Sequence, residues 1–501
     1  MRPQFSRMGL AIESETFEPG QYTRFSDRLD ECLEALRQVL GRPGFGVGPK
    51  TVGAELEMFL VDGSGFALPV NRQVLGRTMD PRVTVEIDRF NLECNLRPCA
   101  LAGRPFSALR AEFESALAEV RRAAATLGAR VAVTGILPTL READLTRGAI
   151  TALPRYRALS TSIRNLRNQE PFQIAIAGED SLNLAWDDVS MEGANTSLQF
   201  HLRVDPADFA RLYNTAQLVT GPVLAVSSNS PFLLGRRLWD ETRVALFRQA
   251  VDDRGEAHAS SKPARVSFGQ GWVREGALEL FAESVALHPP LLPVLGPESP
   301  LAQLKQGGLP RLDELRLHQG TVWSWNRAIY DPSAGGHLRI EFRALPAGPS
   351  VVDMLANGAL LLGLTLGLAP QVDTLLPALP FSFARGNFLR AAQRGLDAEM
   401  MWPQRRAPSP QPVPAVELVE RLLPVAREGL VGAGVEADEA EALLAVIQGR
   451  LRARRTGARW QREMLARLEP RMPRPDAFAA LLERYMACAA SGRPVHEWPL
   501  D

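Results

Sequence analysis

The chain has 501 residues, of which 46% are hydrophobic and 23% charged, a composition typical of globular proteins long enough to form a large core. Basic and acidic residues both number 57, so the formal net charge is zero. This balance argues against nucleic acid or an anionic membrane as the main partner. The four cysteines match neither a disulfide framework nor a zinc-site spacing, which favours a reducing, cytoplasmic setting.

The first predicted elements are a helix at residues 24–40 and a loop rich in proline and glycine at 41–50. Residues 52–61 then form an apolar run that is interrupted by Glu55 and Glu57. The Phe, Leu and Val content of this run predicts a β-strand, in which side chains two residues apart share one face. Two adjacent carboxylates on such a strand are tolerable if they face water or share a cation, and Mg²⁺ prefers such hard oxygen ligands. For this stretch alone, an ordinary solvated strand face is an equally good interpretation.

The same alternation recurs in three later stretches, at 91–97, 197–204 and 338–344, with Glu86 just upstream of the first. The polar faces of these predicted strands carry Asn91, Glu93, Asn95 and Arg97, then Gln199, His201 and Arg203, then Arg339, Glu341 and Arg343. A merely solvated face would also be expected to carry Thr, Ser and Lys, but the four polar faces contain a single Ser and neither Thr nor Lys. The pattern therefore predicts an α+β fold, with a mostly antiparallel sheet, helices on its apolar face and a site on its polar face. Glu and His are ligands for divalent cations, and Arg forms rigid forks that match phosphate or carboxylate.

Helices are predicted around this sheet at 106–127, 206–220 and 354–368, and a strand at 130–135. The helix at 354–368 is too short and too rich in glycine to span a membrane, and we interpret it as buried. Basic residues are dense at 151–170, where a solvated helix face is favoured over a site for a substrate carboxylate. After residue 384, amphipathic helices are predicted at 416–430, 436–452 and 476–488, with a Pro-rich linker at 403–414.

Several motifs, taken in order, resemble the glutamate–cysteine ligase family, and more narrowly its bacterial carboxylate–amine ligase branch. They are Gly53-x-Glu55-x-Glu57, the segment from Glu86 to Glu93, Thr196-x-x-Gln199-x-His201 and Glu341-x-Arg343. Two downstream stretches also fit, namely Asn387-x-x-x-Ala391-x-x-x-Gly395-Leu396-Asp397-Ala398 and Thr456-Gly457-Ala458-x-Trp460-Gln461. The resemblance spans roughly residues 50–465 and implies a glutamine-synthetase-type catalytic fold. The expected organisation is a helical lead-in at 1–44, a catalytic domain at 45–400 and a helical C-terminal cap at 401–501.

The resemblance implies an enzyme that uses ATP and Mg²⁺ to activate the side-chain carboxylate of glutamate as an acyl phosphate, which an amine then displaces. Cysteine is the default amine. The implied metal ligands are Glu55, Glu57, Glu86, Glu93, His201 and Glu341. Arg343 is expected at the γ-phosphate and, with Glu57, in catalysis; Gln199, Arg203 and Arg339 are expected at the nucleotide. The expected substrate contacts are Asn95, Arg97, Asn229 and Arg243.

Two departures from the family pattern concern the substrate more than the ATP chemistry. Many members have a second histidine where this chain has Gln199, which would weaken metal binding there or make the position a nucleotide contact. A Pro- and Gly-rich turn at 344–350 follows the last site strand. The same fold with another amine, phosphotransfer to a guanidino group, and a non-catalytic sensor of nucleotide or amino acid are therefore the alternatives. The expected partners are small molecules rather than nucleic acid or membrane, and a homo-oligomer is left open.

Overall fold

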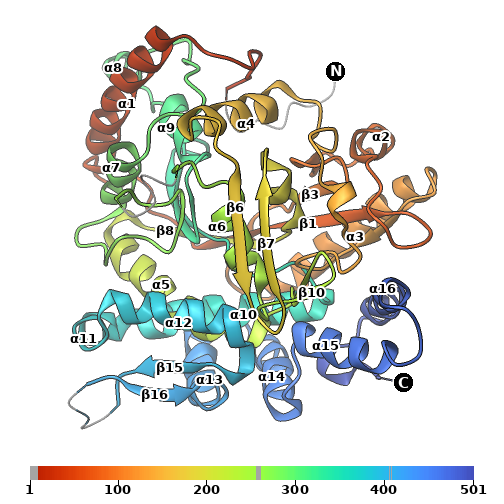
Figure 1. Ribbon diagram of the computed structural model, residues 1–501. Coiled ribbons are helices and arrows are strands. Elements are labelled where there is room, and N and C mark those ends of the chain that lie inside the picture. Colours follow the sequence, from red (N-terminus) through yellow and green to blue (C-terminus); the bar gives the residue numbers. More distant parts are fainter. Residues whose placement is uncertain (1–9, 256–260, 405–406, 408, 501) are drawn as a thin grey trace.

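The computed structural model describes residues 10–255, 261–404, 407 and 409–500, and a single antiparallel sheet lies at its centre (Figure 1). The strand order is β13-β14-β8-β1-β3-β2, and the short strands β4 and β5 also pair with β1. The strand bounds are β1 Thr51–Val61, β2 Val83–Val85, β3 Asn91–Asn95, β4 Cys99–Ala100, β5 Arg130–Ala132, β8 Leu198–Val204, β13 Asn326–Asp331 and β14 His337–Phe342. This confirms the expected α+β fold, although the sequence patterns did not predict β2, β4 and β13 of this sheet.

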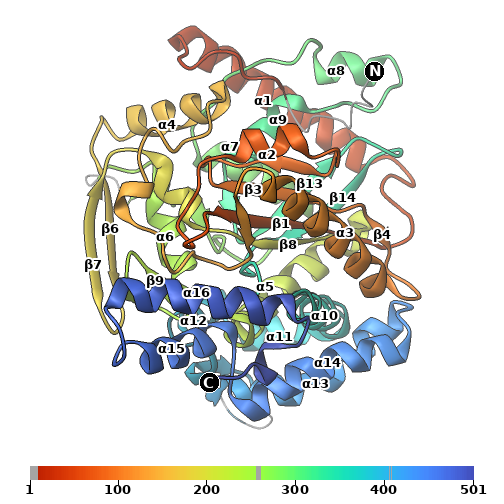
Figure 2. The same cartoon turned by 90° about the vertical axis from the view of Figure 1, so that its right-hand side faces the viewer.

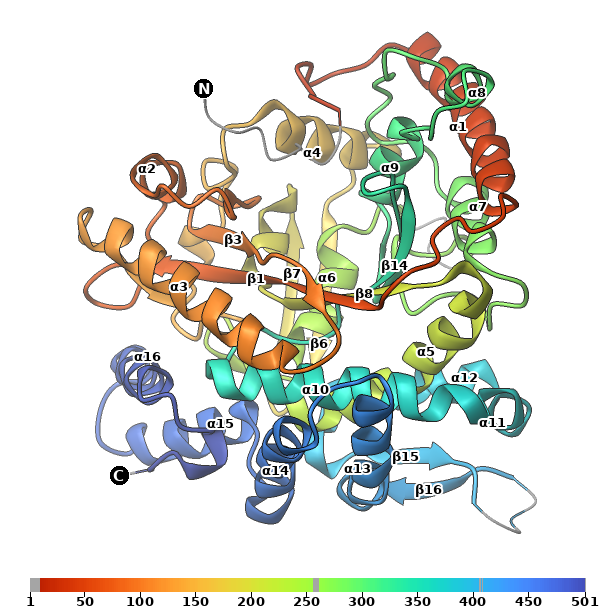
Figure 3. The same cartoon turned by 180° about the vertical axis from the view of Figure 1, so that it is seen from behind.

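The apolar face of the sheet is covered by the three helices predicted from the sequence, which Figure 3 shows from behind. They are α3 (Pro105–Ala125), α5 (Phe209–Ser227) and α10 (Val351–Leu368). Helix α10 touches the sheet closely, because a Cβ added to Gly358 would lie 2.2 Å from the ring of Phe200. The segment Val351–Ala378 is long and apolar enough to cross a membrane, but 78% of its most apolar window is buried in the fold. The expectation of a buried core helix is therefore confirmed.

The opposite side of the sheet faces a layer formed by other helices and by a hairpin (Figure 1). This layer contains α4 (Pro154–Leu166), α6 (Thr242–Ala250) and the hairpin of β6 (Phe172–Ala177) and β7 (Ser181–Trp186). At one edge, α1 (Pro19–Leu40) packs on α7 (Ala277–Leu287), α8 (Pro300–Lys305) and α9 (Asp313–Gln319). The remaining short elements are α2 (Asn71–Arg77), β9 (Phe232–Leu233), β10 (Arg236–Arg237), β11 (Val266–Ser267) and β12 (Trp323–Ser324).

The C-terminal helices gather at one end of the molecule (Figure 2). They are α11 (Val372–Ala378), α12 (Phe381–Arg394), α13 (Ala415–Gly432), α14 (Ala437–Ala453), α15 (Gly457–Leu468) and α16 (Arg474–Ala490). The expected Pro-rich linker at 403–414 is partly wrong, because residues 411–414 form β16 (Gln411–Pro414), which pairs with β15 (Glu399–Trp402). Residues 405, 406 and 408 of this linker lie outside the described residues. Helix α13 lies against α10 so closely that a Cβ on Gly429 would be 2.1 Å from the carbonyl oxygen of Gly363. The cap is thus packed tightly on the helices behind the sheet.

Candidate functional site

The register of the sheet brings the polar positions of four strands onto one continuous face. On β1, Glu57 lies opposite Glu93 of β3, and Glu55 lies opposite Gln199 of β8. Further along β8, His201 lies opposite Glu341 of β14. Because side chains directly opposite each other in an antiparallel pair are neighbours on the same face, acidic groups far apart in the sequence become adjacent in space.

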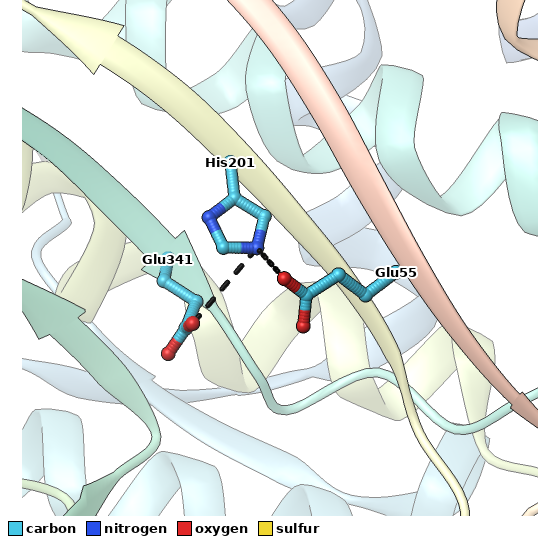
Figure 4. A group of neighbouring side chains, drawn as sticks. All are labelled: Glu55, His201 and Glu341. Atoms are coloured by element: carbon cyan, nitrogen blue, oxygen red, sulfur yellow. Dashed lines mark ion pairs between the residues drawn. The ribbon is translucent and has the colours of Figure 1, made fainter. Parts of the chain in front are cut away.

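Glu55, His201 and Glu341 form the most compact group on this face (Figure 4). His201 Nε2 lies 3.0 Å from Glu55 Oε1 and 3.8 Å from Glu341 Oε1. One ligand atom from each residue falls within 4.8 Å of the other two, which is close enough for a single cation to contact all three. The side chains of His201 and Glu341 are only 9% and 4% exposed. A buried histidine between two carboxylates is therefore the centre of the candidate site.

Glu57 is held by a set of hydrogen bonds from β8 and its approach. The backbone N–H and the hydroxyl of Ser197 donate to Glu57 over 2.6 and 3.0 Å, and Gln199 Nε2 donates to Glu57 Oε1 over 3.1 Å. The carbonyl end of the same amide, Gln199 Oε1, accepts from Arg343 Nη1 over 2.7 Å. Gln199 thus links the carboxylate of Glu57 to the guanidinium of Arg343, which only a side chain with both a donor and an acceptor can do.

Carboxylates crowd the part of the face near β2 and β3. Burial and the nearby Glu86 raise the pKa of Glu57 to about 7. Burial and repulsion from Glu55, Glu86 and Glu57 raise the pKa of Glu93 well above its usual range. Glu192 joins this cluster, and burial with repulsion from Glu86 and Glu57 raises its pKa as well. Sequence reasoning missed Glu192 because it lies in a short 3-10 segment, Val189–Ala194, that has no alternating pattern. Such a concentration of negative charge favours a divalent cation.

Arginines surround the other carboxylate of the central group, and one of them was missed from the sequence. Arg327 on β13 lies opposite Glu341 and donates to both of its oxygens, over 2.7 and 3.1 Å. Arg343 Nη1 reaches the same carboxylate over 3.1 Å. Although burial alone would raise it, these two guanidinium groups and His201 bring the pKa of Glu341 far below its usual range. Glu341 is therefore ionised at neutral pH, ready to contact a cation.

The remaining nucleotide and substrate candidates lie in different places. Asn95 donates to Glu93 Oε1 over 2.5 Å and so belongs to the carboxylate cluster. Arg97 follows β3 and is exposed. Arg203 and Arg339 lie opposite each other, each two residues along its strand from His201 or Glu341.

Asn229 and Arg243 are fully buried and have protein partners. The Asn229 amide donates to the Ala347 carbonyl and to the Tyr485 hydroxyl, both over 2.7 Å. Arg243 contacts Glu241 Oε1 and the Ala344 carbonyl, both over 2.8 Å. These contacts support the chain after β14, at 344–347, and do not reach the central group.

The downstream motif at 456–461 contacts the same buried side chain, Asn229. A Cβ on Gly457 would lie 2.0 Å from Asn229 Oδ1, and Gln461 Nε2 donates to that oxygen over 2.9 Å. The motif thus fixes the cap to the core, and glycine is required at this close approach.

Comparison with known proteins gives one family match and several similar structures. The family model "Glutamate-cysteine ligase family 2 (GCS2)" matches residues 51–270, which include β1, β3 and β8 but not β14. A glutamate–cysteine ligase (gshA) from Francisella tularensis, solved in complex with AMP, superposes with a TM-score of 0.55 at 10% identity, covering 91% of each chain. A bifunctional glutathione synthetase from Pasteurella multocida gives a TM-score of 0.49 at 11% identity, covering 94% of this chain and 55% of that one. No curated protein sequence matches. The first structural likeness shows a shared fold.

Proposed function

We propose that this chain is a ligase that uses ATP and Mg²⁺ to join an amine to the side-chain carboxylate of glutamate, because residues 51–270 match the model of glutamate–cysteine ligase family 2. Cysteine is the default amine, and γ-glutamylcysteine would then be the product. The observation that carries the proposal is the group of Glu55, His201 and Glu341 beside Arg343. It joins metal ligands to a guanidinium in the way that phosphoryl transfer requires. The four cysteines, all free, are in keeping with a cytoplasmic enzyme.

The chemistry of the donor set fits Mg²⁺. Glu55, His201 and Glu341 would hold one ion, because His201 Nε2 lies beside both carboxylates, while the buried Nδ1 has no hydrogen-bond partner among the described residues. Glu57, Glu86 and Glu93 would hold further ions, since these carboxylates are too close together to be ionised without nearby positive charge. When bound, Mg²⁺ would neutralise the ATP phosphates and orient the γ-phosphate.

The residues of the chain would then position two successive displacements. In the first, an oxygen of the glutamate side chain attacks the γ-phosphorus, and the bond to ADP breaks. In the second, the amine nitrogen attacks the acyl carbon, the bond to phosphate breaks, and the amine loses a proton. Arg343 would stabilise the charge on the transferring phosphoryl group. Gln199 would hold Arg343 in place through the hydrogen bond between them. Glutamine in place of the family's second histidine would then serve Arg343, and no metal ligand is needed at that position.

Two exposed arginines are available to bind the α-carboxylate of glutamate. Arg97 and Arg155 have no ion pair among the described residues, and Arg155 is close enough to Glu86 to lower the pKa of that carboxyl against the effect of burial. Guanidinium groups form bidentate pairs with carboxylates. We therefore assign the substrate carboxylate to the rim of the carboxylate cluster, with Arg155 at the start of α4 as its main partner.

The deciding experiment measures ADP release from ATP and Mg²⁺ with glutamate and a panel of amines that includes cysteine, with products identified by mass. ADP release that requires both glutamate and an amine, with an amide product, would establish the ligase and identify the amine. ATP binding without turnover across the panel would favour another carboxylate substrate or a sensor, and a phosphorylated guanidino compound would favour phosphotransfer. Glu341→Gln is the matched inactive control, because it removes one charge from the central group and keeps the side-chain shape.

A further inference from the structure

We propose that Arg203 and Arg339 form a second oxyanion site on the polar face, next to His201 and Glu341, and that this site binds the α- or β-phosphate of the nucleotide. The inference rests on the proposed function and gives the nucleotide a direction along the sheet. Its γ-phosphate would lie at Arg343, and the rest of the molecule would extend along β14 towards Arg339.

The first observation is a pair of like charges with unused donors. Arg203 and Arg339 lie directly opposite each other in the antiparallel register of β8 and β14, where two like charges repel and destabilise the sheet. A guanidinium has five N–H donors. Arg203 uses only Nη2, 3.4 Å from the carbonyl oxygens of Gly46 and Val47, and Arg339 uses only Nη1, 2.6 Å from Asp331 Oδ2. The Nε of each arginine is buried and has no hydrogen-bond partner among the described residues. An oxyanion between the two would satisfy these donors and remove the repulsion.

The second observation is the glycine-rich loop that leads into β1 and lies over Arg203. A Cβ on Gly48 would be 2.7 Å from Arg203 Nη2, so a larger residue at this position would displace the guanidinium. Gly44 and Gly46 adopt left-handed φ angles of 77° and 73°, which only glycine adopts without strain. Between them and Gly48, Val47 is 64% exposed. A glycine-rich loop beside two arginines, with an exposed apolar side chain at its edge, favours a nucleotide over a small amino acid as the occupant.

The other charged groups at this end leave the two arginines able to bind an anion. Asp331 pairs with one nitrogen of Arg339, and Asp205 accepts from the backbone N–H of Gly48 over 3.2 Å. His337, opposite Asp331 on β13, is buried. Burial, only partly offset by Asp331, acts together with the two arginines to lower the pKa of His337, so this imidazole is neutral at pH 7. Of the two arginines, Arg203 has no acidic partner among the described residues.

The spacing along β14 fits a nucleotide that runs parallel to the strand. Arg339 and Arg343 flank Glu341, each two residues away, so each lies about 7 Å along the chain from it. A triphosphate whose γ-phosphate lies between Arg343 and the metal ligands can place its inner phosphates near Arg339. The side-chain carboxylate of glutamate must instead meet the γ-phosphate at the Arg343 end. Arg343 would therefore hold the reacting γ-phosphate, and Arg203 with Arg339 would hold the inner phosphates.

The test compares Arg203→Gln and Arg339→Gln with Arg211→Gln, a control at an exposed arginine whose ion pair with Asp208 spans 3.9 Å. Calorimetry measures the binding of AMP, of ADP with Mg²⁺, and of glutamate. We expect AMP and ADP affinities to fall at least about tenfold in both site variants, because a hydrogen-bonded charge is lost, with no change in the control. Thermal unfolding without nucleotide adds a second readout. Arg203→Gln should leave the melting temperature equal or higher, because the repulsion between the arginines disappears, whereas loss of a purely structural arginine would lower it.

Several outcomes would overturn the inference. AMP and ADP affinities within twofold of wild type in both variants would remove the phosphate site. A weaker affinity for glutamate with unchanged affinity for AMP would identify the occupant as the substrate carboxylate. A lower melting temperature without nucleotide in Arg203→Gln would make that arginine structural. The proposed ligase function fails on a different result, namely absence of amide formation by the wild-type protein, so the two failures are distinguishable.

Discussion

Gln199 offers the sharpest test of the proposed mechanism, because its amide contacts Glu57 at one end and Arg343 at the other. The isosteric change Gln199→Met removes both hydrogen bonds and keeps the length of the side chain. Each bond involves a charged partner, and such bonds contribute about 1.5–3 kcal/mol. If the hydrogen bond from Arg343 to Gln199 contributes only when charge develops on the phosphoryl group, its loss should lower kcat by roughly 10- to 150-fold with little change in the KM for ATP.

A second variant at this position adds a readout that a purely structural role would not change. Gln199→Glu keeps an acceptor for Arg343 but places a carboxylate where the amide donates to Glu57, 3.1 Å away. Burial and Glu86 already raise the pKa of Glu57 to about 7, and a further negative charge should raise it more. Because Glu57 acts as a carboxylate, the acid limb of the pH–rate profile should move to higher pH. Steady-state ADP release from pH 6 to 9 measures both effects, with Gln249→Met in α6 as a control on an amide outside the site. Wild-type kcat in Gln199→Met, together with an unshifted profile in Gln199→Glu, would refute the bridging role.

Four further predictions concern the site and its support. Glu57→Gln should abolish turnover with little loss of folding, as circular dichroism and ADP release would show; wild-type activity would disprove its role. Because the pKa of Glu57 is raised, the folded state binds more protons than the unfolded state between the ordinary glutamate range and about pH 7. The metal-free protein should therefore lose stability as pH rises through that window, and Mg²⁺ should restore it in thermal melts. Gly429→Ala should destabilise the protein by about 1–3 kcal/mol, because its Cβ would overlap α10, whereas Gly432→Ala in the same helix meets open space and serves as the control in urea titrations. Arg450→Met should cost about 3–5 kcal/mol in the same titration, since it leaves the fully buried Asp353 without its ion pair.

The sheet and most of the site were predictable because a period of two is visible in a single sequence. Wherever one face of a strand is apolar, as with Leu198, Phe200 and Leu202 on β8, the other face is identified by elimination. The order of the strands could not be predicted in this way. Strand β1 pairs with both β3 and β8, and no local pattern encodes which strands become neighbours. The family resemblance implied the type of fold, and the structure supplied the order of the strands.

The residues that were missed reveal what a strand pattern cannot show. Arg327 lies on β13, whose alternation Asn-Arg-Ala-Ile-Tyr-Asp mixes polar and apolar residues on both faces, so nothing in the sequence links it to Glu341. Its importance follows only from the register, which places it directly opposite that carboxylate. Without this arginine, Glu341 would lack one of the two guanidinium groups that keep it ionised in a buried position. The charge balance of the site is therefore a property of neighbouring strands, and a motif confined to Glu341 and Arg343 captures only part of it.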